Sequence, residues 1–329
     1  MVGKGSRFRR RLTALIASVW TLCLSASAEE IPLVLQSGRA LRARLSLPVR
    51  AAAQPRSQIP VLLVFGGFQK AGEVIELMRR TGLGEDYALA SFDYPFEPPR
   101  KIIFPESLFW IPKLHQMVHE TFEGIRILDA RLSEDFRFDP RRRILLGASL
   151  GAPMALGAIH RGARPTHLAL IHGFGAFESV VAWQFERPWQ KSWGSLSCFA
   201  PSVSKALARA LLWRSGVGSA ENWAENLPEG LSVLQVSPRE DEFVPRSAIE
   251  SLEDSLRRSK AKVEFRKTQA GHLQPGAIPT LQEIGVLLQK WLASDQAREK
   301  PPRDHQSNQG SYNPKGLKPA PGRKNLGKL

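Results

Sequence analysis

Cysteine is nearly absent from this chain. Only Cys23 and Cys198 occur among its 329 residues, and Cys23 lies in a segment with the features of a removable export signal. A mature chain that retains Cys198 alone cannot form an internal disulfide, so its stability must come from packing. Because Cys198 stands in an apolar, aromatic stretch, we predict that its side chain is buried and unreactive.

The N-terminus lacks an apolar run long enough to cross a membrane. The run from Leu12 to Leu24 has 13 residues, whereas a spanning helix needs about 20. Five basic residues precede it and small residues follow at 26–28, which is the pattern of a secretory signal peptide. We therefore predict that residues 1–28 are a signal, cleaved before Glu29, and that the protein is exported to the periplasm or the extracellular space. An uncleaved membrane anchor is the alternative.

The middle of the chain lacks a strong excess of positive charge, although the whole chain carries +15. Residues 1–28 hold five positive charges and no negative ones, and residues 298–329 hold eight positive against two negative. About +4 remains for the rest, which provides no basic stripe of the kind that nucleic-acid binding requires. We therefore expect no nucleic-acid partner.

The last residues, 298–329, are rich in Pro, Gly, Lys, Asn and Gln. They contain too few large apolar residues to offset the entropy cost of ordering, so we predict a disordered basic tail. Such a tail would be attracted electrostatically to an anionic surface or a polyanionic partner. A solubilising extension without a specific partner is the alternative.

Between these ends, short apolar segments alternate with amphipathic ones. Residues 29–49 alternate apolar and polar side chains around Gly38, which indicates an antiparallel hairpin at a sheet edge. Further predicted strands are 61–65, 87–92, 144–146, 167–171, 231–236 and 263–268, and predicted helices are 71–80, 107–132, 150–160, 246–258 and 278–293. The alternation predicts one α/β domain over residues 29–297, with a mostly parallel, doubly wound sheet.

One interval breaks this alternation. Residues 173–228 contain no predicted strand but hold five of the eight tryptophans. We predict a helical cap inserted over the sheet. Its tryptophans supply either core and interface area or contacts to a substrate.

A serine stands between two glycines at a predicted strand-to-helix junction. The segment Gly147-Ala148-Ser149-Leu150-Gly151 follows the apolar run 144–146 and precedes a helical pattern. This is the Gly-x-Ser-x-Gly nucleophile elbow in its expected context. A Cβ at either glycine would collide with the neighbouring strand and helix, so the pattern predicts a tight turn that presents Ser149 as a nucleophile.

A serine hydroxyl needs a base, and the base needs a group that fixes its tautomer. His272 follows the last predicted strand, and Asp241 follows the strand before it. Because the carboxyl ends of parallel strands meet at one edge of a sheet, both side chains are expected beside Ser149. Glu240 and Glu242 flank Asp241 and remain alternative acids.

Over about residues 33–292, the chain resembles the α/β-hydrolase superfamily. The resemblance rests on the elbow at Ser149, an Asp-x-x-Val-Pro segment that starts at Asp241, and a Gly-His pair that ends at His272. The chain order Ser, Asp, His agrees with that family. The resemblance implies that Asp241 orients His272.

The resemblance also implies an oxyanion hole, built from backbone N–H groups. One donor is Leu150, and the other is Gly67 or Phe68 in the loop after an early strand. This chain has Phe65 where many relatives have a histidine that braces the loop. The alternative for the glycine pair is a plain tight turn.

We therefore expect a secreted serine hydrolase that cleaves carboxylic esters through an acyl-enzyme on Ser149. Its partner would be a small-molecule acyl substrate, with no cofactor and no metal. Peptidase, lipase and thioesterase activities on the same triad are alternatives. A further alternative, motivated by Phe65, is a catalytically inactive binding protein.

Four other histidines invite interpretation. His115 and His119 lie four residues apart on a predicted helix but lack an evident third ligand, so a solvated helix face is favoured over a metal site. His160 and His172 flank apolar segments and are predicted to be structural. Asp93, at the end of a predicted strand, is a candidate for turn capping.

Overall fold

The computed structural model describes residues 28–48, 58–67, 69–95, 111–192, 194–215, 220–269, 271–273 and 277–299. The predicted signal, apart from residue 28, and the predicted tail, apart from residues 298 and 299, lie outside this part of the chain, as does Phe68. The described residues up to Trp291 belong to one compact unit, and those from Leu292 onward belong to a second. Within the described ranges, no helix is long and apolar enough to cross a membrane.

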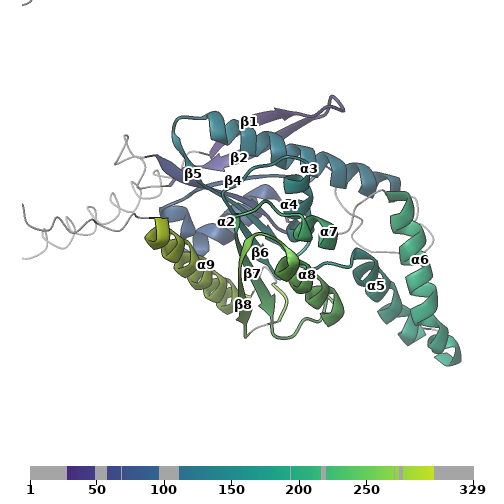
Figure 1. Cartoon of the computed structure of the whole chain (residues 1–329). Helices are drawn as coiled ribbons and strands as arrows, with labels where there is room; N and C mark the ends of the chain where they lie inside the picture. The colour runs from purple at the N-terminus through teal and green to yellow at the C-terminus, as the bar shows by residue number, and fades with distance from the viewer. Residues whose placement is uncertain are drawn as a thin grey trace, which may run out of the picture. The chain divides into compact units, whose positions relative to one another are not determined.

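An eight-stranded sheet is the centre of the first unit (Figure 1). Its order is β1-β2-β4-β3-β5-β6-β7-β8, with β1 and β2 forming an antiparallel hairpin and β2 running antiparallel to β4. All other pairs are parallel. The strands are β1 (Ala28–Val34), β2 (Ala40–Ser46), β3 (Ile59–Phe65), β4 (Ala88–Phe92), β5 (Phe138–Ala148), β6 (His167–Ile171), β7 (Ser232–Pro238) and β8 (Lys262–Thr268). The predicted fold class is confirmed.

β5 is longer than the sequence predicted. It begins at Phe138 rather than at residue 144, because Phe138 already pairs with Ile59 of β3 across a β-bulge. The intervening residues include Pro140 and three arginines, which interrupt the apolar run used to place the strand. Backbone pairing therefore extends beyond the buried part of the strand.

The helices that alternate with the strands agree with the predicted ones within a few residues. They are α2 (Ala71–Arg80), α3 (Ile111–Glu134), α4 (Gly151–His160), α8 (Arg246–Arg258) and α9 (Ile278–Glu299). The predicted start of α3 at residue 107 lies outside the described residues. Between β6 and β7 the described residues form no strand but three helices, α5 (Phe177–Ser192), α6 (Ala200–Ser215) and α7 (Ala220–Glu225).

The prediction of a buried Cys198 is wrong. The residue lies in a 3-10 turn, Gly194–Phe199, that connects α5 to α6, and its side chain is exposed. The neighbouring Phe199 is itself 59% exposed. Apolar composition does not by itself determine burial, so the apolar neighbours of Cys198 led to the wrong prediction.

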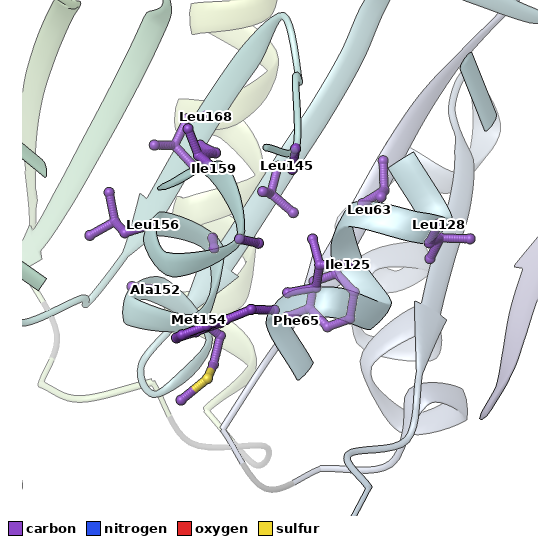
Figure 2. Close-up of a cluster of buried hydrophobic side chains, with 14 of the residues drawn as sticks. Leu63, Phe65, Ile125, Leu128, Leu145, Ala152, Met154, Leu156, Ile159 and Leu168 are labelled. Carbon is purple, nitrogen blue, oxygen red and sulfur yellow. The ribbon is translucent and has the colours of Figure 1, made fainter. Parts of the chain in front are cut away.

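Alternate residues of the central strands face two different helical layers. Leu63 and Phe65 of β3 pack with side chains of α3 and α4, including Ile125 and Met154 (Figure 2). On the opposite face of β3, Val64 lines a small cavity together with side chains of α2 and of the first part of α9. β3 is thus buried on both faces, as is typical of a central strand in a parallel sheet.

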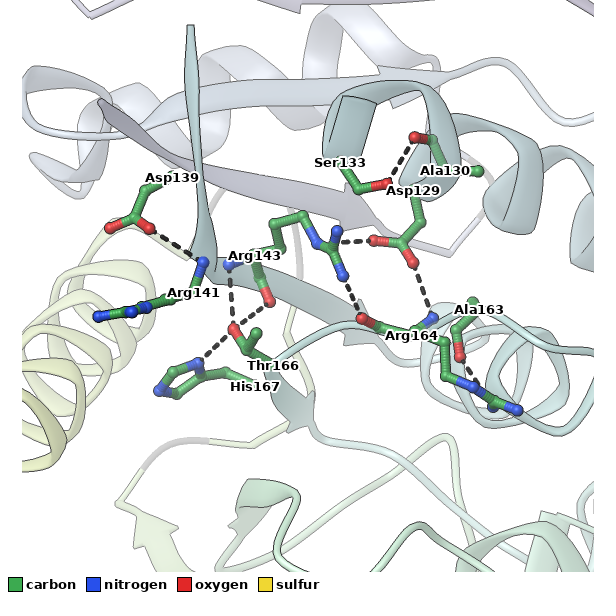
Figure 3. Close-up of polar contacts among 10 residues, drawn as sticks. All are labelled: Asp129, Ala130, Ser133, Asp139, Arg141, Arg143, Ala163, Arg164, Thr166 and His167. Carbon is green, nitrogen blue, oxygen red and sulfur yellow. Dashed lines mark hydrogen bonds and ion pairs between the residues drawn. The ribbon is translucent and has the colours of Figure 1, made fainter. Parts of the chain in front are cut away.

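A buried ionic cluster ties α3 to β5 and to the loop before β6 (Figure 3). Asp129 Oδ2 accepts the backbone N–H of Arg164 at 2.7 Å, and Asp129 Oδ1 lies 3.4 Å from Nε of Arg143. The Arg143 guanidinium also donates to the carbonyl of Arg164. Desolvation by burial raises the pKa of Asp129 despite these partners.

Loss of this carboxylate is expected to destabilise the fold. Asp129→Ala leaves the buried Arg143 without its counter-charge, so the free energy of unfolding should fall by about 3–5 kcal/mol. Urea denaturation measures the change. The control is Asp254→Ala, which breaks a surface pair with Arg257 and should cost at most about 1 kcal/mol. Equal costs for both variants would show that the buried cluster contributes no more than a surface pair.

Candidate active site

Ser149 occupies a sharp turn between β5 and α4. Its φ is +53°, in the left-handed region that non-glycine residues rarely adopt. The turn is held on both sides: the N–H of Ser149 donates to the carbonyl of Ile171 at 2.9 Å, and its carbonyl accepts the N–H of Ala152 at 3.0 Å. These bonds fix a strained backbone of the kind found at functional sites.

The two glycines of the turn permit a very close approach of backbones. A Cβ on Gly151 would lie 1.9 Å from the carbonyl oxygen of Phe65 in β3, and a Cβ on Gly147 would lie 2.3 Å from the carbonyl oxygen of Gly151. No side chain fits at either position. The structure therefore agrees with the expectation that a Cβ at either glycine would collide with the neighbouring strand or helix.

His272 and Asp241 lie where the sequence placed them, after β8 and β7. These strands are parallel neighbours, so the loops that follow them lie at the same sheet edge. His272 Nε2 is 2.9 Å from Ser149 Oγ, and His272 Nδ1 is 2.7 Å from Asp241 Oδ2. A continuous path of two hydrogen bonds therefore joins the hydroxyl to the carboxylate.

The Asp241 carboxylate is well supported in its charged form. Its side chain is only 2% exposed, and its Oδ1 accepts the backbone N–H groups of Phe243 and Val244, each at 2.8 Å. Desolvation favours the neutral form, but the hydrogen bonds from His272 and these two amides outweigh it and lower the pKa of Asp241. The flanking acids Glu240 and Glu242 are exposed, and the residue in contact with His272 is Asp241.

The pairing determines which ring nitrogen of His272 carries hydrogen. A carboxylate only accepts, so Nδ1–H donates to Asp241. Nε2 is then left with a lone pair directed at the Ser149 hydroxyl. This tautomer can take a proton from serine without any rearrangement.

The loop after β3 is braced by Tyr94, which the sequence did not single out, and by Asp93, the predicted turn-capping residue. The hydroxyl of Tyr94 donates to the carbonyl of Gly66 at 2.7 Å, and Asp93 Oδ1 accepts the N–H of Ala71 at 2.6 Å, which caps α2. Phe65 is buried and packs edge-on against Phe92, with ring centroids 4.9 Å apart. Phe65 thus belongs to the hydrophobic core.

A small cavity of about 30 Å³ adjoins Ser149 and Gly67. Its lining is mainly apolar and comes from β3, β5, α2, α9 and the segment after His272. The lining residues are Val64, Gly66, Gly67, Gln69, Val74, Leu77, Met78, Leu146, Ala148, Ser149, Leu273 and Leu281. Of the three candidate oxyanion donors, Gly67 lines this cavity, Leu150 follows the nucleophile, and Phe68 lies outside the described residues.

The helical insertion between β6 and β7 contacts the loop that carries Asp241. Gln184 and Arg187 of α5 donate to the backbone carbonyls of Phe243 and Glu242, at 2.8 and 2.5 Å. The Phe243 ring lies 5.4 Å from the His272 ring between centroids and is 40% exposed. The helical insertion therefore borders the site.

Of the other histidines, His115 and His119 lie at a separate cavity, whereas His172 lies beside His272. His115 and His119 line a separate polar cavity of about 720 Å³ together with Arg126 and Arg161. Among the described residues, no group of three or more His, Cys, Asp and Glu side chains is arranged to hold a metal ion. His172, by contrast, is fully buried, and its ring centroid lies 6.1 Å from that of His272.

The tight contact at Gly151 gives a direct test of the turn. Gly151→Ala must displace β3 from α4, so we expect a loss of at least about 3 kcal/mol in the free energy of unfolding, or no folded protein. Gly230→Ala is the matched control, because Gly230 has φ +78° and no atom lies within 4 Å of the position that a Cβ would occupy. That change should cost only the left-handed backbone strain, about 1–2 kcal/mol. Similar melting temperatures for the two variants would contradict the close approach.

Comparison with known proteins supports the fold. No protein-family model matches the chain, and no curated protein sequence matches it. Among solved structures it resembles the esterase domain of a Rhodothermus marinus protein, with a TM-score of 0.51 and 15% identity over 82% of this chain and 99% of that one. It also resembles carboxyl esterase 2 of Tuber melanosporum, with a TM-score of 0.51 and 18% identity over 82% of this chain and 88% of that one. An esterase of Pyrococcus furiosus has a TM-score of 0.52 and 12% identity over 82% of this chain and 93% of its own. The chain has the α/β-hydrolase fold.

Proposed function

We propose that the protein is a serine hydrolase in which Ser149 is the nucleophile, His272 the general base and Asp241 the acid that orients the base. One observation carries the proposal: the 2.9 Å and 2.7 Å contacts join the three side chains in the order that proton transfer needs. They come from loops more than 30 residues apart in the sequence, and the partner of His272 is a buried carboxylate kept charged by backbone amides.

The geometry supports acyl transfer in two steps. His272 Nε2 removes the hydroxyl proton as Ser149 Oγ attacks the substrate carbonyl, and the same proton then goes to the leaving alcohol. In the second step His272 deprotonates a water molecule that attacks the acyl carbon, the bond to Ser149 Oγ breaks, the carboxylic acid leaves, and the proton returns from His272 to Ser149. The backbone N–H groups of Leu150 and Gly67 are proposed to stabilise the oxyanion of each tetrahedral intermediate.

Carboxylic esters with a short acyl group are the proposed substrates. Several structural neighbours carry esterase names, which supports ester hydrolysis, and one is a dipeptidyl peptidase, so peptide cleavage is the second candidate. The cavity beside Ser149 is lined by apolar side chains that include Val74, Met78 and Leu281. Its volume of about 30 Å³ holds only a small apolar group, given that a water molecule needs roughly 10–15 Å³ by the same measure.

A fluorophosphonate probe tests the nucleophile. The probe should form a covalent adduct on Ser149 of the wild-type protein, located by peptide mass spectrometry, because only an activated serine reacts at neutral pH. Ser149→Ala should abolish labelling, whereas Ser202→Ala, which removes an exposed hydroxyl from α6, should leave it unchanged. A folded wild-type protein that stays unlabelled would instead indicate a binding protein on this fold.

Substitution of each acidic residue in turn tests whether Asp241, rather than Glu240 or Glu242, orients His272. Asp241→Asn removes the charge that fixes the His272 tautomer, so kcat for a p-nitrophenyl acetate substrate should fall about 10⁴-fold. Glu242→Gln and Glu240→Gln alter exposed side chains and should change kcat less than about threefold. The steady-state rates of all three variants are compared at pH 7.5. A large loss in either glutamate variant, with Asp241→Asn active, would reassign the acid.

A further inference from the structure

His172 occupies an unusual backbone position next to the proposed triad. It follows β6 directly, has φ +50° and is fully buried. Its N–H donates to the carbonyl of Val236 in β7 at 2.7 Å. Since a left-handed conformation is costly for a non-glycine residue, the surrounding structure must hold it in place.

The His172 ring links β8 to the segment that carries His272. Its Nδ1 accepts the backbone N–H of Leu273 at 3.0 Å, and its Nε2 lies 2.9 Å from Thr268 Oγ1. An amide N–H can only donate, so Nδ1 bears the lone pair and Nε2–H donates to the threonine hydroxyl. The contacts therefore require one neutral tautomer of this ring.

The surroundings of His172 keep the ring neutral. Burial lowers its pKa first, and the neighbouring His272 lowers it further, while Asp241 acts in the opposite direction. The resulting pKa is about 4. A protonated ring would turn an N–H toward the N–H of Leu273, so the contact exists only while His172 is uncharged.

We propose that His172 is a positioning residue for the hydrolytic site. It holds Leu273, the residue after His272, at a fixed distance from the ends of β6, β7 and β8, and thereby sets the approach of the His272 imidazole to Ser149. The inference rests on the proposed function of the triad. His172 itself touches neither Ser149 nor a substrate in this scheme.

A pair of amide variants separates the two contacts of the ring. In His172→Asn the side-chain oxygen takes the place of Nδ1 and can still accept the Leu273 N–H, and asparagine tolerates a left-handed backbone. In His172→Gln the amide reaches toward Thr268, and the acceptor for Leu273 is lost. We expect kcat within about threefold of wild type for His172→Asn and about 10- to 100-fold lower for His172→Gln, with KM little changed, because a small misplacement of a catalytic group has this effect.

Two readouts distinguish positioning from a general loss of stability. Amide hydrogen exchange at Leu273 should be slow in wild type and His172→Asn and fast in His172→Gln. Fluorophosphonate labelling of the folded protein should slow in parallel with kcat. Thr268→Val, which removes the hydroxyl that accepts the Nε2–H of His172 and keeps a similar side-chain volume, should give an intermediate loss and serves if His172→Gln does not fold.

Equal kcat and equal Leu273 exchange in His172→Asn and His172→Gln would overturn the positioning role. If His172→Gln fails to fold, wild-type activity of Thr268→Val would overturn it instead. Failure of the proposed function looks different. In that case wild type is neither labelled nor active, yet Leu273 exchange still depends on the residue at 172.

Discussion

The site depends on one constraint, which is that β5, β7 and β8 run parallel and end at the same edge of the sheet. Each of these strands is followed by a residue of the proposed triad, so three side chains more than 30 residues apart meet without a long loop. The constraint also explains why backbone groups are so prominent here. Amides of residues 243 and 244 hold the acid, and the carbonyl of Ile171 in β6 holds the nucleophile turn.

Two buried aspartates show how the same burial gives opposite electrostatic results. Desolvation raises the pKa of Asp129, which has one short amide contact and an arginine at 3.4 Å. The Asp241 side chain is also only 2% exposed, but two amides and an imidazole donate to it at 2.7–2.8 Å, and its pKa is lowered. Short donors to the charged form therefore decide the state of a buried carboxylate more than its exposure does.

The sequence predicted the positions that depend on local pattern and strand order. The glycines around Ser149 mark the turn, and the places of Asp241 and His272 follow from the strands before them. It did not predict contacts that depend on how separate loops meet. Nothing near Tyr94 in the sequence indicates that its hydroxyl meets the carbonyl of Gly66, and His172 had the same signal as any histidine beside an apolar run. The exposure of Cys198 depends likewise on its place in the turn between α5 and α6, which its apolar neighbours in the sequence do not reveal.

The contacts from α5 to the carbonyls of residues 242 and 243 make the insertion part of the scaffold around the acid. Exchanging these helices for those of another hydrolase would remove two donors from the loop that presents Asp241. An engineered chimera would therefore have to retain Gln184 and Arg187, or supply equivalents, before any new specificity introduced by the foreign helices became measurable.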